Sequence, residues 1–188
     1  MSIVIGIKKD GVIYMGADTQ RTCGGTKCNC LSESNFKITR FKNGVLLGHV
    51  GTVRTSYLMY IQEQLFDGVE KHGLTKEFLV REIVPIYKRI ARDNKCVDKS
   101  DNTVNSALIV AYKDKMFRIR NDFGVVDCDL AIIGSGTDYA IPYIVSEKTD
   151  DPNERILKGI YGAEKFNIGV SRPCVFINTS ELEYKIVK

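Results

Sequence analysis

The first fifteen residues constrain the fold more than any other stretch of the sequence. Residues 3–7 read Ile-Val-Ile-Gly-Ile, Asp10-Gly11 is a strong hairpin-turn signal, and residues 12–15 resume an apolar run. Both arms are apolar on both faces, whereas a hairpin with one solvated face would alternate apolar and polar residues. The pattern therefore predicts two paired strands that are covered on each side.

Further strand signals follow along the chain. Lys42-Asn43-Gly44 marks a second hairpin turn, and the polar stretch 23–35 predicts a loop. The strands predicted after the first hairpin cover residues 36–41, 45–50, 104–112, 115–120, 129–133, 174–177 and 184–187.

Helical periodicity occurs in two separate parts of the sequence, each with room for two helices. Thr75 is suited to cap a helix, Pro85 would kink or break that helix, and Asp151 followed by Pro152 is a good helix start. The predicted helices are one around residues 53–70, one around 75–91, a short one over 138–146, and one that begins at Asp151.

This order of elements predicts an α+β fold. Hairpin connections favour antiparallel sheets, and two pairs of helices need two faces to cover. A four-layer αββα sandwich, with two stacked antiparallel sheets between helical layers, satisfies both requirements. Since the sequence shows no repeat, no low-complexity segment and no linker, residues 1–188 are predicted to form a single domain.

Composition excludes several classes of function. Lys and Arg number 27 against 23 Asp and Glu in 188 residues, and they are spread along the chain, which disfavours nucleic-acid binding. No apolar stretch approaches the roughly 18 residues of a membrane span. No basic segment precedes a hydrophobic one at the N-terminus, so we expect no secretory signal and a cytoplasmic protein.

The cysteines leave one alternative open. Six are present, and Cys23, Cys28 and Cys30 lie within eight residues, so three thiols could bind zinc. Their spacing is not that of paired CxxC motifs, so reduced thiols in a glycine-rich loop are the favoured interpretation.

No cofactor is predicted. Gly134 and Gly136 are not part of a GxxxxGK[ST] phosphate loop, which argues against nucleotide binding. His49 and His72 are too few for a metal centre, and we assign neither a role.

Four short segments, taken in order, carry a resemblance to a known family. They are residues 2–22, which include Gly16-Ala17-Asp18-Thr19, and residues 35–38, 48–51 and 133–140. Together they resemble mature proteasome β subunits and the bacterial peptidase HslV, which are N-terminal nucleophile hydrolases. Each segment alone is a weak signal, but the ordered set spans most of the chain.

The resemblance implies a function and a site. It implies peptide-bond hydrolysis inside a homo-oligomeric ring, with peptide or unfolded protein as substrate and an ATPase unfoldase as a possible partner. The implied site consists of the nucleophile Ser2 after removal of Met1, the acidic residue Asp18, the lysine Lys37, the oxyanion donor Gly48 N–H, and Ser135 beside the nucleophile.

The chemistry explains why these residue types would occur together. A serine hydroxyl is a poor nucleophile without a base, and an N-terminal serine carries its own base in the α-amino group, whose ordinary pKa is about 7.7–8.0. A nearby ammonium such as that of Lys37 would lower this pKa, and Asp18 would hold the lysine in place. A backbone N–H at the developing oxyanion contributes about 2.7–4 kcal/mol to catalysis.

The sequence also departs from the family pattern. The family usually begins with threonine, and serine lacks the methyl group that restricts χ1. Asn167 stands where proteasome subunits have an aspartate, and Ser171 is one position away from the expected serine. Two alternatives therefore stay open, namely an inactive or regulatory proteasome-like assembly protein, and a hydrolase of the same fold that acts on a small amide.

Overall fold

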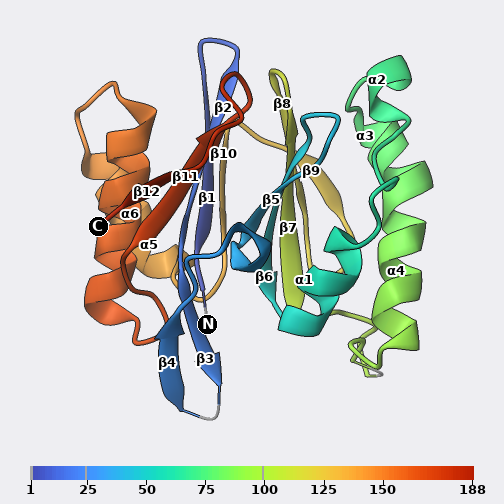
Figure 1. Ribbon diagram of the computed structural model, residues 1–188, viewed down its shortest axis with the longest axis horizontal. Coiled ribbons are helices and arrows are strands. Elements are labelled where there is room, and N and C mark those ends of the chain that lie inside the picture. The colour runs from blue at the N-terminus through green and yellow to red at the C-terminus, as the bar shows by residue number, and fades with distance from the viewer. Residues whose placement is uncertain (1, 24, 99) are drawn as a thin grey trace.

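Four layers are stacked side by side in the computed structural model, which describes residues 2–23, 25–98 and 100–188 (Figure 1). Helices α5 (Thr137–Ser146) and α6 (Pro152–Phe166) form one outer layer, and the helical segments between residues 53 and 93 form the other. Two five-stranded antiparallel sheets lie between them. The predicted αββα sandwich is therefore confirmed.

The first sheet contains the N-terminal hairpin at its centre. The turn is tight, since Lys9 pairs with Val12 and both Asp10 and Gly11 have positive φ angles of 50° and 77°, as the primed hairpin turns require. The strand order is β10-β1-β2-β11-β12, with β1 Val4–Lys9, β2 Val12–Asp18, β10 Leu130–Ile133, β11 Cys174–Asn178 and β12 Lys185–Val187.

The second sheet has the order β5-β6-β7-β8-β9. Its strand β9 was not anticipated from the sequence, and only Val125 of its three residues is buried. The strands are β5 Ile38–Arg40, β6 Leu46–Gly51, β7 Ser106–Tyr112, β8 Lys115–Ile119 and β9 Val125–Asp127.

Three apolar clusters fill the spaces between the layers. The inter-sheet cluster includes Val4, Met15 and Ile109, all fully buried. A second cluster lies under α5 and α6, and a third lies between the second sheet and the other helical layer. Because both faces of β1 and β2 are covered, the two-sided apolar pattern of the N-terminal hairpin is explained.

The layer formed by α5 and α6 follows the sequence prediction closely. The Asp151 carboxylate accepts a hydrogen bond from Asn153 N–H at 2.8 Å, which caps α6 as expected. The predicted short helix over 138–146 corresponds to α5, which begins one residue earlier.

The opposite helical layer differs from the prediction. The single helix expected around residues 53–70 is instead α1 (Val53–Tyr60), a series of turns, and α2 (Val69–His72). Leu65 and Phe66 lie in these turns and are nevertheless buried, so their spacing in the sequence resembled the apolar face of a helix. Burial by a turn and burial by a helix give the same signal over one or two residues.

Pro85 does not end its helix. Thr75 Oγ1 accepts from Phe78 N–H at 3.1 Å and caps α3 (Lys76–Phe78) as predicted. A π-helical turn, Leu79–Ile83, then leads into α4 (Val84–Asp93). Since Pro85 lies in the first turn of α4, the amide it lacks is one that would have no partner within α4 itself.

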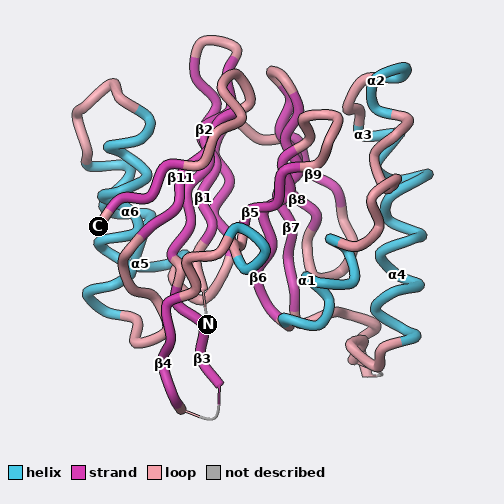
Figure 2. The backbone as a smooth tube through the Cα atoms, in the orientation of Figure 1, coloured by secondary structure: helices cyan, strands magenta, loops and turns pink. Residues whose placement is uncertain are grey.

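The stretch 23–35 is not a plain loop. Strands β3 (Gln20–Cys23) and β4 (Thr26–Asn29) form a hairpin that extends beyond the two sheets (Figure 2), and a 3₁₀ turn follows at Glu33–Asn35. The residues of β4 are exposed, so no apolar alternation marks the strand in the sequence.

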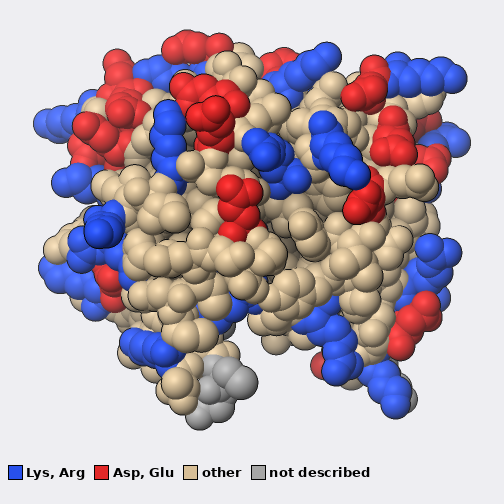
Figure 3. Space-filling view, in the orientation of Figure 1, with Lys and Arg blue, Asp and Glu red and all other residues tan. Residues whose placement is uncertain are grey.

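The surface carries charges of both signs. Lys and Arg are interspersed with Asp and Glu on the face drawn in Figure 3, and the lower edge of that face is hollowed between the two halves of the molecule. Among the described residues, no helix has the length and apolar content needed to cross a membrane.

Candidate active site

Ser2 lies two residues before the start of β1 at Val4. It is 9% exposed. Its backbone N–H donates to Ser135 Oγ at 3.2 Å, and its carbonyl accepts from Gly136 N–H at 3.3 Å. Gly134 has φ +110° and passes so close to Ser2 that an added Cβ would lie 2.2 Å from the Ser2 carbonyl oxygen. The glycine-containing segment therefore fixes the position of Ser2.

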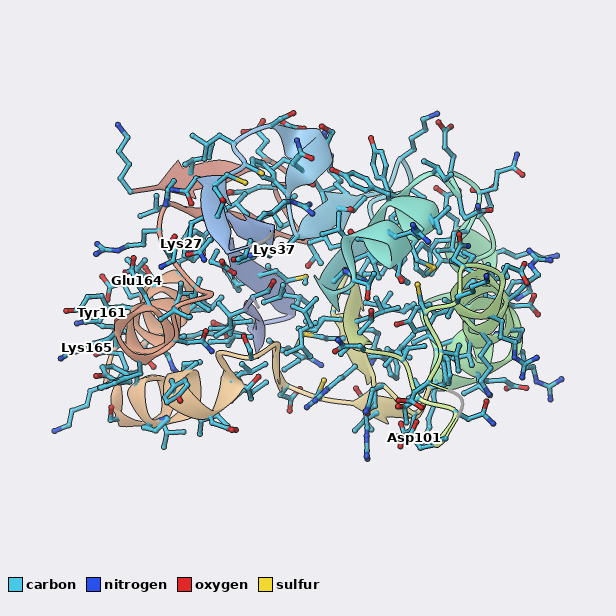
Figure 4. The ribbon with its side chains drawn as sticks, turned by 90° about the horizontal axis from the view of Figure 1, so that it is seen from below. Lys27, Lys37, Asp101, Tyr161, Glu164 and Lys165 are labelled. Atoms are coloured by element: carbon cyan, nitrogen blue, oxygen red, sulfur yellow. The ribbon has the colours of Figure 1, made fainter. Side chains whose placement is uncertain are left out.

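A buried ion pair lies directly behind Ser2. Asp18 Oδ1, at the end of β2, is 2.6 Å from Lys37 Nζ and also accepts from Ile3 N–H at 2.8 Å. Lys37 Nζ donates to the Gln20 carbonyl at 2.7 Å. Figure 4 shows Lys37 in the interior, whereas Lys165 lies on the outer helix α6. The structure thus holds the lysine head group at one place next to the start of the chain.

Burial favours the uncharged form of both partners. Desolvation lowers the pKa of Lys37, partly opposed by the charge of Asp18, and desolvation raises the pKa of Asp18, partly opposed by Lys37. A lysine in such a place is sensitive to the loss of its carboxylate, because that carboxylate and its hydrogen bond favour the charged form.

Gly48 is not brought to this site. It lies within β6 and pairs with Ile38 on one side and Ile109 on the other. An added Cβ would lie 2.8 Å from both Met15 Cε and Val4 Cγ1, so this position faces the inter-sheet core. A glycine is required here because the two sheets approach closely.

Gly51, at the end of the same strand, does lie beside Ser2. His49 N–H donates to the Lys37 carbonyl at 2.8 Å, which points it toward the β5 edge of β6. Amides two residues apart on a strand point to the same edge, so Gly51 N–H also faces that edge. Thr52 N–H points the other way, to Ser106 Oγ at 3.4 Å. Gly51 also has φ +113°, which few other residues tolerate.

Two recesses open beside Ser2. The smaller has a volume of about 70 Å³, and Ser2, Lys37, His49 and Gly51 are among its lining residues. The larger has a volume of about 640 Å³ and runs past Gly51 toward the segment 103–107. Ser2 and Gly51 line both recesses, so the serine and the glycine amide lie where the two meet.

Asn167 holds the segment that contacts Ser2. Its side-chain Nδ2 donates to the Ser135 carbonyl at 2.7 Å, and its Oδ1 accepts from Gly169 N–H at 2.9 Å. Ser171 instead points its hydroxyl to Asn29 Oδ1 at 3.4 Å, on the β3–β4 hairpin. Asn167 thus contacts the loop that contains Ser135, and Ser171 contacts the β3–β4 hairpin.

The three clustered cysteines, for which zinc binding was the less favoured alternative, lie on the β3–β4 hairpin and its exit. Cys28 is exposed and Cys30 half-buried, and both are free thiols. The side chain of Cys23 and all of Met1 fall outside the described part of the chain. Within that described part, no cluster of three or more His, Cys, Asp or Glu residues could hold a metal ion.

The fold has been seen before in solved structures of other proteins. BPH from Thiobacillus denitrificans, solved in complex with epoxomicin, superposes with a TM-score of 0.72 at 19% identity, covering 96% of this chain and 99% of that one. HslV from Trypanosoma brucei gives 0.67 at 16% identity, with coverage of 94% and 98%.

Anbu, an ancestral β-subunit from Yersinia bercovieri, gives a TM-score of 0.66 at 14% identity, with coverage of 99% and 87%. No family model matches the sequence. At these identities the likeness concerns the fold alone, and the chain therefore has the architecture shared by HslV and Anbu.

Proposed function

We propose that this protein is a peptide-bond hydrolase in which Ser2, freed by removal of Met1, is an N-terminal nucleophile. The main support for this proposal is the arrangement of residues around Ser2. Ser2 and Gly51 line two adjoining recesses, the larger with Ser135 and the smaller with Lys37, whose ammonium pairs with Asp18, although these residues are far apart in the sequence. Residues 1–188 would form a single catalytic domain.

In the proposed reaction, the α-amine of Ser2 takes the proton from its own Oγ as that oxygen attacks the substrate carbonyl carbon. The resulting ammonium then gives a proton to the departing amine, and an ester to Ser2 remains. Water, activated by the same amine, adds to this ester, releases the acid and restores the serine. The substrate is therefore cleaved without any external reagent other than water.

Each neighbouring group has a distinct part in this reaction. Lys37 favours the neutral, basic form of the amine by like-charge repulsion, and Asp18 keeps Lys37 in place. Ser135 Oγ lies where it can accept from the amine and orient its lone pair toward the Ser2 hydroxyl. We assign the oxyanion contact to Gly51 N–H instead of Gly48, because only Gly51 lines the recess with Ser2.

We further propose that the protein works as a proteasome-like homo-oligomeric ring in the cytoplasm, with unfolded protein as substrate and an ATPase unfoldase as a possible partner. Large apolar side chains are exposed on both outer layers, and such surface suits contacts between copies of the chain. They include Val53, Tyr57, Tyr60, Ile61 and Val80 on one layer, and Tyr139, Ile141, Val145, Tyr161 and Phe166 on the other.

The test is hydrolysis of an unstructured fluorogenic peptide library by protein whose Met1 has been removed. We expect Ser2→Ala to abolish cleavage while the thermal melt stays unchanged. The matched control is Ser180→Ala, which alters an exposed turn serine far from the site and should keep wild-type turnover.

Three outcomes separate the candidate functions. Full activity of Ser2→Ala would contradict the nucleophile. Assembly without any cleavage by the wild-type protein would favour the regulatory scaffold, and cleavage of simple amides but no peptides would favour the small-amide hydrolase. Light scattering on the processed protein tests the ring, which a monomer with undiminished activity would contradict.

A further inference from the structure

The small recess beside Ser2 contains an unusual set of buried polar atoms. Gln20 Oε1, Arg21 Nε and His49 Nε2 each lack a hydrogen-bond partner among the described residues, and all three side chains belong to the lining of this recess. A buried polar atom without a partner costs about 1–3 kcal/mol. Three such atoms around one recess indicate that their partners come from outside the protein.

The charge of the recess is positive. Lys37 is neutralised by Asp18, whereas Arg21 pairs with no carboxylate among the described residues, and no Asp or Glu lines the recess. Arg21 is nevertheless fixed, because its Nη2 donates to the Asn35 carbonyl at 2.6 Å and its Cζ lies 5.6 Å from the centroid of the Tyr57 ring. Its guanidinium is therefore held in place before any ligand arrives.

His49 adds a neutral donor. Burial, with a further contribution from the charge of Arg21, lowers the pKa of His49 to about 3. The imidazole is therefore uncharged near neutral pH and has one N–H to donate. A carboxylate that accepted from both Arg21 Nε and His49 would satisfy two of the three atoms.

We propose that this recess receives the side chain of the substrate residue whose carbonyl Ser2 attacks, and that it selects aspartate. The inference rests on the proposed hydrolase function. The size supports a short side chain, since about 70 Å³ has room for only a few water molecules. A carboxylate also suits a site with one uncompensated guanidinium, because charge-assisted hydrogen bonds are the strongest available.

Asparagine is the closest competitor and gives the sharpest control. Because Gln20 Nε2 already donates to the Ile168 carbonyl at 3.0 Å, the atom of Gln20 left for a ligand is the acceptor Oε1. An ionised carboxylate has no hydrogen to donate to it. The amide of asparagine would satisfy Gln20 but would give up the charge interaction with Arg21. Aspartate and asparagine have nearly the same shape, so a comparison of the two isolates the effect of charge.

The experiment compares peptides that differ only in the residue before the cleaved bond, which is Asp, Asn, Leu or Arg. With protein lacking Met1, we expect kcat/KM for the Asp peptide to exceed that for the Asn peptide by tenfold or more, with Leu and Arg lower still. Arg21→Gln should reduce the Asp-to-Asn ratio to near one. Arg89→Gln removes the same charge from the exposed face of α4 and should keep the ratio.

A binding measurement separates this proposal from the hydrolase proposal. Ser2→Ala protein, which has no nucleophile, is titrated with fluorescent peptides ending in Asp or Asn, and anisotropy gives the two Kd values. Tighter binding of the Asp peptide, by tenfold or more, supports the recess even if the wild-type protein cleaves nothing. Equal binding of both peptides, or tighter binding of the Asn peptide, overturns the recess proposal even if cleavage occurs.

Discussion

Two groups of polar side chains adjoin Ser2, and they differ in whether the protein itself pairs their charges. Asp18 and Lys37 form an ion pair at 2.6 Å and bond to nearby backbone groups, although Asp18 Oδ2 is buried without a partner in the described chain. Gln20, Arg21 and His49 line the small recess, each has one buried atom without a partner in the described chain, and Arg21 pairs with no carboxylate there.

The difference separates a group that holds the site from a group that awaits a ligand. A buried ion pair keeps one geometry, because breaking it leaves an uncompensated charge. The unpartnered nitrogens of Arg21 and His49 gain hydrogen-bond partners when substrate enters, so their effect falls on selectivity more than on stability. Mutations in the two groups should therefore be distinguishable by their effects on folding.

The largest effect is expected from Lys37→Ala. It leaves Asp18 fully buried without its counter-charge, and removal of one partner of such a pair costs about 3–5 kcal/mol. Activity should fall by about 10²–10⁴-fold, the range for loss of a group that assists proton transfer. Urea unfolding and peptide hydrolysis measure the two effects.

A double variant tests whether the stability loss comes from the stranded charge. Asp18→Asn with Lys37→Met removes both charges at similar volume, so we expect it to recover most of the stability lost in Lys37→Ala but none of the activity. The comparison between the two groups would be contradicted if Lys37→Ala were as stable as wild type. It would also be contradicted if the double variant regained turnover.

The sequence predicted the ion pair better than the group around Arg21. The two-sided apolar pattern of the first hairpin predicts β1 and β2, and with them the positions of Ser2 and Asp18 at neighbouring strand ends. The placement of Lys37 was expected from the family resemblance.

The errors at the site come from strand register. In the segment 48–51 both glycines are candidates for a backbone donor, and only the pairing of His49 with Lys37 decides which amide faces Ser2. The sequence offers His49 no role, because two histidines are too few for a metal centre and only the fold places its side chain at the recess. Such choices depend on contacts between strands distant in sequence.

The pH dependence of stability should report on His49. Its folded pKa of about 3 lies below the ordinary value of 6.5, so the unfolded chain binds more protons as the pH falls below 6.5. The stability that depends on neutral His49 is therefore fully present above pH 6.5 and is lost progressively toward pH 3. The expected loss in the free energy of unfolding is about 2 kcal/mol between pH 6.5 and pH 5.

Urea unfolding at pH 7 and pH 5 measures this effect. His49→Leu should remove its share of the pH dependence, whereas His72→Gln, which changes the exposed histidine, should keep the wild-type slope. An unchanged slope in His49→Leu would show that His49 is not the neutral buried group that the recess requires.

A smaller effect is expected from Ser135→Ala. The substitution removes the acceptor of the Ser2 N–H bond, and one such hydrogen bond contributes about 0.5–1.5 kcal/mol. We therefore expect kcat to fall between about twofold and tenfold with little change in KM. A loss as large as that of Lys37→Ala would mean that Ser135 takes part in proton transfer directly.

The smallest effect is expected from Ser2→Thr. Threonine keeps the hydroxyl and restricts χ1, so activity should stay within about threefold of wild type or rise. Steady-state kinetics with one peptide suffices as the measurement. Complete loss of activity would indicate that the space around Ser2 admits no additional methyl group.

The proposed nucleophile is a free N-terminal serine. The most direct measurement is the intact mass of preparations that differ in methionine removal, taken together with peptide hydrolysis on the same samples. We expect activity to rise in proportion to the fraction that has lost one methionine and to be absent when all chains retain it. Full activity in a preparation that retains Met1 would contradict the account.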